Sequence, residues 1–157
     1  MPTFEGAPWP QAGERGPQAV QQLVSGPNGS DTTDSVYEVA GTVALWPLSV
    51  MCRLTCSGAP GDRTVALEYR TPDDVRYLVA GTRAVVQAGV TQSFCWQPQA
   101  GGEVWPVEDA AIASLPQQHI YPGYKLAIKI GNGQAGDVLD RVLISARFDP
   151  IMLDEGE

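Results

Sequence analysis

The pattern of hydrophobic and polar positions changes near residue 36. From there on, short runs alternate apolar and polar side chains, are rich in Val, Thr, Tyr and Trp, and are separated by turn residues. Alternation with a period of two indicates half-buried β-strands. The pattern predicts strands over Val36–Leu45, Leu48–Cys56, Arg63–Arg70, Val75–Val79, Thr91–Trp96, Tyr124–Ile130 and Val138–Phe148. The segment Glu108–Gln118 is predicted mainly as a loop.

Alternation also assigns each side chain to a face of its strand. Apolar positions such as Val50, Leu67, Ile128 and Ile144 recur at every second residue, and we expect them in the core. The intervening positions carry charges, and we expect these to face outward: Arg53, Arg63, Glu68, Arg70, Lys125, Lys129, Arg141 and Arg147.

Seven or eight strands without a helix longer than two turns predict an all-β fold. The expected architecture is an antiparallel β-sandwich, jelly-roll-like, with an extended N-terminal arm. We divide the chain into a Pro/Gly-rich arm (1–35), a β-sandwich domain (36–150) and an acidic C-terminal tail (151–157). Apart from residues 18–24, the first 35 residues lack the apolar periodicity of a core element. We expect this arm to bind neighbouring subunits.

Composition narrows the function classes. The formal net charge is −8 and the ten basic residues are scattered, which disfavours direct nucleic-acid binding. The apolar runs are far shorter than the roughly 20 residues of a membrane-spanning helix. The N-terminus has no apolar secretory segment, so we expect the chain to stay in the cytoplasm where it is made.

The three cysteines, Cys52, Cys56 and Cys95, form no CxxC pair, and only one histidine accompanies them. We therefore expect neither a disulfide framework nor a metal site, and interpret the three thiols as small buried hydrophobic groups.

No motif carries recognisable catalytic chemistry. Gly131, Gly133 and Gly136 have dinucleotide-fingerprint spacing, but the following residues alternate like a strand where that motif needs a helix, so we interpret them as a hairpin loop. His119 is interpreted as a loop or interface residue. A cupin-like enzyme needs several His/Glu metal ligands, and the single histidine of this chain disfavours that alternative. We expect no catalytic residue, no cofactor and no enzymatic activity.

Aromatic residues supply the candidate binding sites. We expect Trp46 and Trp96 in the core, because both lie in or beside strands. Tryptophan is enriched at binding hot spots, and Trp9 and Trp105 lie in segments that a sandwich does not easily bury. The predicted partner-binding residues are Phe4, Trp9, Trp105 and Tyr121.

Several short motifs resemble a divergent group of tailed-bacteriophage virion proteins. They are the run Gly61-Asp62-Arg63-Thr64-Val65-Ala66-Leu67-Glu68-Tyr69-Arg70, then Phe94-Cys95-Trp96, Tyr121-Pro122-Gly123-Tyr124-Lys125-Leu126 and Gly136-Asp137-Val138-Leu139. The resemblance covers roughly residues 45–148 and leaves out the arm. It implies a β-sandwich structural component of a phage particle.

This resemblance implies a capsid decoration (cement) protein that bridges neighbouring major capsid subunits. The expected partners are the major capsid protein and further copies of the chain itself, in a closed oligomer such as a trimer. The expected location is the surface of the phage head. Two alternatives stay open: an accessory head-neck or tail protein, and a carbohydrate-binding β-sandwich that uses exposed aromatics such as Trp105 and Tyr121 as a sugar platform.

Overall fold

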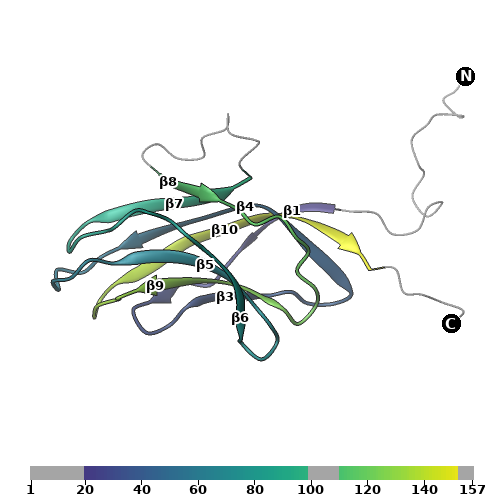
Figure 1. The fold of residues 1–157 in the computed structure, drawn as a ribbon, viewed down its shortest axis with the longest axis horizontal. Helices are drawn as coiled ribbons and strands as arrows, with labels where there is room; N and C mark the ends of the chain where they lie inside the picture. The colour runs from purple at the N-terminus through teal and green to yellow at the C-terminus, as the bar shows by residue number, and fades with distance from the viewer. Residues whose placement is uncertain (1–19, 99–109, 152–157) are drawn as a thin grey trace, which may run out of the picture.

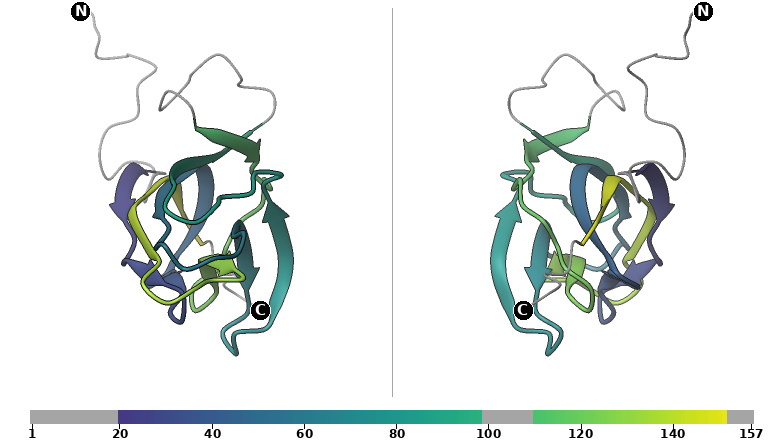
Figure 2. Two further views of the ribbon diagram at one scale, coloured as in Figure 1. Left: turned by 90° about the vertical axis from the view of Figure 1, so that its left-hand side faces the viewer. Right: turned by 90° about the vertical axis from the view of Figure 1, so that its right-hand side faces the viewer.

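The computed structural model describes residues 20–98 and 110–151, which form two β-sheets packed face to face (Figures 1 and 2). The all-β sandwich prediction is confirmed. The strands are β1 (Val20–Ser25), β2 (Gly29–Ser30), β3 (Ser35–Glu38), β4 (Val43–Thr55), β5 (Thr64–Arg70), β6 (Arg76–Gly81), β7 (Thr91–Gln97), β8 (Ala111–Ser114), β9 (Lys125–Gly131) and β10 (Val138–Pro150).

One sheet has six strands in the order β1-β10-β4-β7-β8, with β2 also paired to β10; the other has the order β3-β9-β5-β6. Most steps along the chain pass from one sheet to the other, so most paired strands are distant in sequence; β5 with β6 and β7 with β8 are the consecutive pairs among the described strands. Every pair is antiparallel except β7 and β8, which are parallel. The prediction of antiparallel pairing throughout is wrong at this pair, where a long connection between Gln97 and Ala111 permits a crossover.

The core lies between the two sheets and receives side chains from both inner faces. Trp96, Leu54 and Ile144 of the six-stranded sheet and Leu67 and Ile128 of the four-stranded sheet are buried. These are the positions that alternation assigned to the core. All three cysteines are buried as predicted, and burial raises the pKa of each thiol, so they contribute to packing as neutral groups.

The sandwich begins earlier than the predicted boundary at residue 36. β1 pairs with β10 over its whole length, with Val24 opposite Ile144, and β2 and β3 follow it. Gln21, Gln22 and Leu23 are exposed. This edge strand is held by backbone hydrogen bonds and has no continuous apolar face, so its side chains give no strong pattern. Assigning residues 20–35 to the arm was therefore wrong, and residues 1–19 lie outside the described ranges.

Two further segments differ from the prediction. The strand predicted over Val36–Leu45 is two strands in different sheets, β3 and β4, separated by a turn in which Gly41 has φ of +79°. A positive φ favours glycine, and it allows the chain to change sheets here. The loop predicted at Glu108–Gln118 contains the four-residue strand β8.

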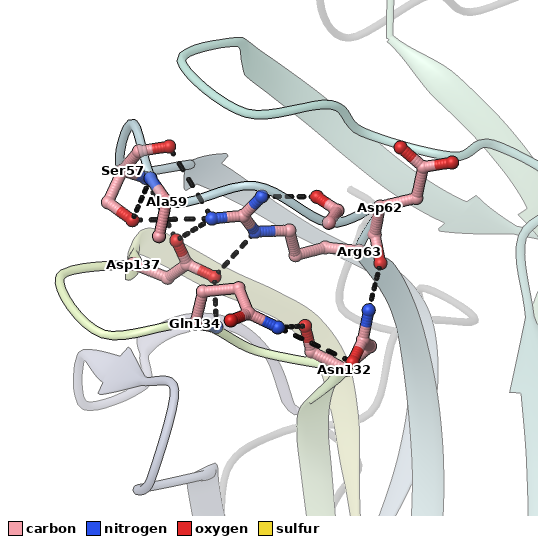
Figure 3. A network of polar contacts seen from close by, with 8 residues as sticks. Ser57, Ala59, Asp62, Arg63, Asn132, Gln134 and Asp137 are labelled. Atoms are coloured by element: carbon pink, nitrogen blue, oxygen red, sulfur yellow. Dashed lines mark hydrogen bonds and ion pairs between the residues drawn. The ribbon is translucent and has the colours of Figure 1, made fainter.

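A buried ion pair joins two loops at one end of the sandwich (Figure 3). Arg63, expected on the outer face, is 0% exposed, as is the side chain of Asp137. The Arg63 guanidinium donates to the two Asp137 carboxylate oxygens at 2.9 and 3.0 Å and also to the carbonyls of Gly61 and Ser57. The same carboxylate accepts the backbone N–H groups of Ser57 and Gln134, each at 2.8 Å.

We call this network the Arg63–Asp137 clamp. It ties the loop between β4 and β5 to the loop between β9 and β10, and each loop links the two sheets. Burial alone would raise the pKa of Asp137, but the hydrogen bonds from Arg63, Gln134 and Ser57 outweigh it and hold the pKa well below its usual range. The carboxylate is therefore ionised throughout the neutral range.

The Asp137→Asn substitution tests the clamp. It leaves the Arg63 charge buried without a counter-ion, so we expect a loss of about 3 kcal/mol or more in the free energy of unfolding, measured by urea denaturation. Folding lowers the pKa of Asp137. The contribution of this carboxylate to the free energy of unfolding is therefore complete above its pKa in the unfolded chain, about 4, and is lost as pH falls through its lower pKa in the folded chain. The native chain should therefore lose stability in acid more steeply than the variant.

The matched control is Asp140→Asn. Asp140 pairs with Arg53 in the same two-bond geometry, at 3.0 and 2.9 Å, but both side chains are partly exposed. Its loss should cost about 1 kcal/mol or less. Equal losses in the two variants would show that burial does not set the strength of the clamp.

Candidate partner-binding surface

The outer face of the six-stranded sheet carries an apolar row across four strands, in which Cys95 is only 1% exposed and the other three residues are partly buried. Leu143, Met51, Cys95 and Ile112 are register partners in turn on β10, β4, β7 and β8. Their chain neighbours on the first three strands (Ile144, Val50 and Trp96) are buried in the core, so the row faces away from it. We call these four residues the apolar row.

Small hydroxyl side chains border the apolar row. Ser145 and Ser49 are register partners on β10 and β4, and Leu23 of β1 lies opposite Ser145 with 66% of its surface exposed. A sheet face that combines apolar and small polar side chains is suited to contact with another protein surface.

An aromatic cluster lies on the same face, beyond the serines. Trp46 of β4 and Arg147 of β10 are register partners, and the guanidinium carbon of Arg147 lies 5.6 Å from the Trp46 ring centroid. The His119 ring meets Trp46 edge-on at 4.9 Å and lies 6.0 Å from Tyr121. We call Trp46, His119, Tyr121, Arg147 and Asp149 the aromatic cluster.

Hydrogen bonds fix most of this cluster in place. Arg147 donates to both carboxylate oxygens of Asp149, at 2.8 and 3.0 Å, and His119 Nε2 lies 2.8 Å from Asp149 Oδ2. Trp46 Nε1 donates to Gln117 Oε1 at 3.1 Å. Arg147 is the main cause of a lowered pKa at Asp149, with a smaller contribution from His119. The rings are therefore positioned before any partner binds, which reduces the ordering cost of association.

Of the predicted partner-binding residues, Tyr121 lies in this cluster with 51% of its surface exposed. Phe4, Trp9 and Trp105 lie outside the described residues. His119 lies in the loop between β8 and β9, in agreement with its interpretation as a loop residue.

Trp96 is in the core as predicted, but Trp46 is not. Counting every second residue back from Val50 places Leu48 and Trp46 inside the sandwich. The register shifts between Ser145 and Ala146, which pair with Ser49 and Pro47, so Leu48 is an extra residue. This bulge reverses the phase and turns Trp46 outward. Sequence reasoning placed Trp46 in the core for this reason, and the only available signal was Pro47 within a strand. Arg147 was expected on the outer face, but no local pattern joins it or Asp149 to Trp46.

The outer face of the four-stranded sheet differs in character. Glu68 is buried there by Arg70 and Arg76, which bond its two carboxylate oxygens, and Lys125 pairs with Asp74. A shallow depression of about 560 Å³ on this face has a lining with as many acidic as basic side chains. Most charged side chains on this face are paired, although Val79 opposite Glu68 is 50% exposed. The six-stranded sheet presents the aromatic cluster instead.

A residue with a strained backbone lies in β10, toward the end of the outer face of the six-stranded sheet. Arg141 has φ of +54° at an irregularity of β10, where the register shifts between Asp140 and Leu143. The left-handed region costs a non-glycine residue roughly 1–2 kcal/mol. Nothing in the described structure bonds the Arg141 side chain in return, which makes it a further candidate for partner contact.

Within residues 20–98 and 110–151, no group of three His, Cys, Asp or Glu side chains is placed to hold a metal ion. The same ranges contain no helix of the length and hydropathy that crossing a membrane requires.

No protein-family model and no curated protein matches the chain. Among solved structures, it is similar over 88% of its length to PfGH50B at 10% identity and a TM-score of 0.36, covering 23% of that chain. It is similar to the nora virus structure at 11% identity and a TM-score of 0.27, covering 88% of this chain and 59% of that one. It is also similar to the structure of infectious bursal disease virus strain Gx at 11% identity and a TM-score of 0.29, covering 88% of this chain and 42% of that one. The chain thus spans less than two thirds of the length of each of these three chains.

The strain at Arg141 gives a direct prediction. Arg141→Gly should leave the free energy of unfolding unchanged or raise it by up to about 1 kcal/mol, since glycine accepts the left-handed region without strain. Arg141→Val should lower it by about 1 kcal/mol or more, although valine favours strands. Chemical denaturation of the three proteins checks this, and a more stable valine variant would contradict the strained geometry.

Alanine substitutions at the adjacent residues Ile120 and Tyr121 should differ strongly in their cost to stability. Ile120 is 0% exposed and pairs with Leu45, so Ile120→Ala should cost about 2–5 kcal/mol of stability. Tyr121 is half exposed, so Tyr121→Ala should cost about 0.5 kcal/mol or less. Thermal unfolding measures both. A large loss for Tyr121→Ala would mean that this ring supports the fold.

Proposed function

We propose that this chain is a non-enzymatic structural protein of a virus particle, most simply a bacteriophage capsid decoration (cement) protein. It acts by binding other proteins through the outer face of its six-stranded sheet. The observation that carries the proposal is the aromatic cluster, in which a tryptophan, a tyrosine and an arginine lie together and partly exposed.

Trp, Tyr and Arg are the residues enriched at the centres of protein interfaces. In this cluster Arg147 and Asp149 neutralise each other, so a partner does not have to bury an unpaired charge. The apolar row lies on the same face and continues it from β10 and β4 to β7 and β8, with Cys95 buried among its partly exposed neighbours. Together they support binding to a protein surface.

The bacteriophage assignment rests on the sequence resemblance, whose motifs have structural positions. The Arg63–Asp137 clamp lies within the motifs Gly61-Asp62-Arg63 and Gly136-Asp137. Strand β7 contains the motif Phe94-Cys95-Trp96. These residues support the fold, so the resemblance concerns the scaffold. We further propose that the order β1-β10-β4-β7 facing β3-β9-β5-β6 is a jelly roll, a fold used by viral capsid domains and by lectins.

In this proposal the protein bridges neighbouring major capsid subunits. Its sandwich face covers one subunit, and residues 1–19, which precede the edge strand β1, reach a second subunit through Phe4 and Trp9. Each bridge adds buried surface that pressure from within the particle must break. The head surface is the proposed location, and a closed homo-oligomer is the proposed assembly.

Co-sedimentation with capsids assembled from the major capsid protein of the same genome tests the proposal. Tyr121→Ala should weaken binding by at least about tenfold, equivalent to 1.4 kcal/mol. Lys129→Ala on the opposite sheet is the matched control and should bind like the native chain. Full-strength binding by Tyr121→Ala would remove the aromatic cluster from the interface, and no binding by the native chain would overturn the decoration role.

Deletion of residues 1–19 tests the arm in the same assay, because it spares β1. Deletion of residues 1–30 would also remove two strands paired to β10 and confound binding with stability. Loss of particle binding in the shorter deletion, with unchanged thermal unfolding, is the expected result.

One observation also favours a carbohydrate-binding module. The exposed Tyr121 ring lies in the same cluster as Asp149, whose planar carboxylate suits sugar hydroxyls. A glycan array probed with the full chain separates the two functions: selective glycan binding that Tyr121→Ala abolishes, without capsid binding, would favour the module.

A further inference from the structure

A pocket of about 520 Å³ lies where the free edges of the two sheets meet. β6 is the last strand of the four-stranded sheet and β8 the last strand of the six-stranded sheet. The pocket is lined by Ala80, Gly81, Thr82, Arg83 and residues 112–116. Its volume is in the range of binding pockets in proteins, and most of its lining is apolar.

Two polar groups in this pocket are without partners in the described structure. The hydroxyl oxygen of Thr82 is the buried side-chain polar atom there that lacks a hydrogen bond. Such a group costs about 1–3 kcal/mol until a partner satisfies it. Arg83, the next residue, forms no ion pair within the described ranges, whereas six of the nine basic residues there do.

These groups define the chemistry of an occupant. Among residues 20–98 and 110–151, no acidic side chain lines the pocket, so Arg83 selects for a negative charge. The apolar lining selects for apolar side chains. No strand of the described ranges pairs with the outer edge of β8, which favours an extended segment that adds as a strand. An extended peptide with apolar residues followed by carboxylates has all three properties.

The chain itself contains such a segment. The described ranges hold ten acidic and nine basic residues, a net charge of −1, so −7 of the total of −8 belongs to the rest of the chain. Residues 151–157 read Ile-Met-Leu-Asp-Glu-Gly-Glu, three apolar residues followed by three carboxylates within four positions. This segment is the predicted acidic C-terminal tail.

Geometry favours a second copy over the same molecule. β8 lies three strands from β10, about 14 Å at strand spacing, with Ala113 aligned to Ile144 through Trp96 and Val50. Pro150 is six residues further along β10, about 20 Å, which separates it from the pocket by roughly 24 Å. Asp154, four residues on, reaches about 14 Å at most.

We propose that the pocket between β6 and β8 binds residues 151–157 of a second copy of this chain. Met152 and Leu153 fill the apolar part, Asp154 and Glu155 pair with Arg83, and Thr82 bonds the incoming backbone. The contact is head-to-tail, and it closes into a ring when the rotation between copies permits. This deepens the proposed function, on which it rests for the expectation that the chain self-associates.

A charge exchange tests the contact, with light scattering of the full-length protein as the readout. The native chain should form a concentration-dependent oligomer. Arg83→Glu alone, and Asp154→Lys with Glu155→Lys, should each weaken association by at least about tenfold. The protein carrying all three substitutions should associate again. Lys129→Glu, an equal charge change at a basic residue outside the pocket, is the control and should associate like the native chain.

Mixing the two weakened variants adds a further test. The native tail of Arg83→Glu fits the native pocket of the lysine-tail variant, and the lysine tail fits the acidic pocket of Arg83→Glu, so the mixture should regain association with the two variants alternating. Undiminished association of both variants would overturn the pocket contact while leaving a homo-oligomer in place. A native chain that is monomeric would overturn this contact, and capsid co-sedimentation would still decide the decoration role separately.

Discussion

The structure depends on one buried ion pair, between Arg63 and Asp137. The two residues are 74 positions apart, and their bond joins two of the loops by which the chain passes between the sheets. Burying two charges is unfavourable unless every donor and acceptor is satisfied, and here backbone groups from both loops complete the network. The pair therefore fixes how the loops, and through them the sheets, are placed at this end of the sandwich.

With the sheets held in this way, the two outer faces are free to differ. On the four-stranded sheet, arginines and lysines pair with carboxylates. On the six-stranded sheet, an aromatic cluster and an apolar row share one continuous face. The sandwich is nearly neutral although the chain has a strongly negative total charge, because most of the negative charge lies in sequence outside the described residues.

Alternation alone located six of the strands and most of the core, because burial on one face imposes a period of two. It could not identify Arg63 as buried, because its partner is remote in sequence and a charged residue at a strand end resembles a solvated one. It misplaced Trp46 because one extra residue at Leu48 reverses the phase. β1 escaped notice because backbone pairing needs no side-chain pattern. The aromatic cluster combines residues from two strands and a loop, so no local motif announces it.

The pairing of β1 with β10 also has a consequence for biosynthesis. β10 contacts β1, β2 and β4, and it is the last of the described strands to leave the ribosome. Until it does, one edge of β4 has no neighbour, and Asp137, which immediately precedes β10, has only just been added to the chain. Folding of this sandwich must therefore wait until β10 has been synthesised. The earlier strands have open edges until then, and this is the stage at which nascent β-rich chains most readily aggregate.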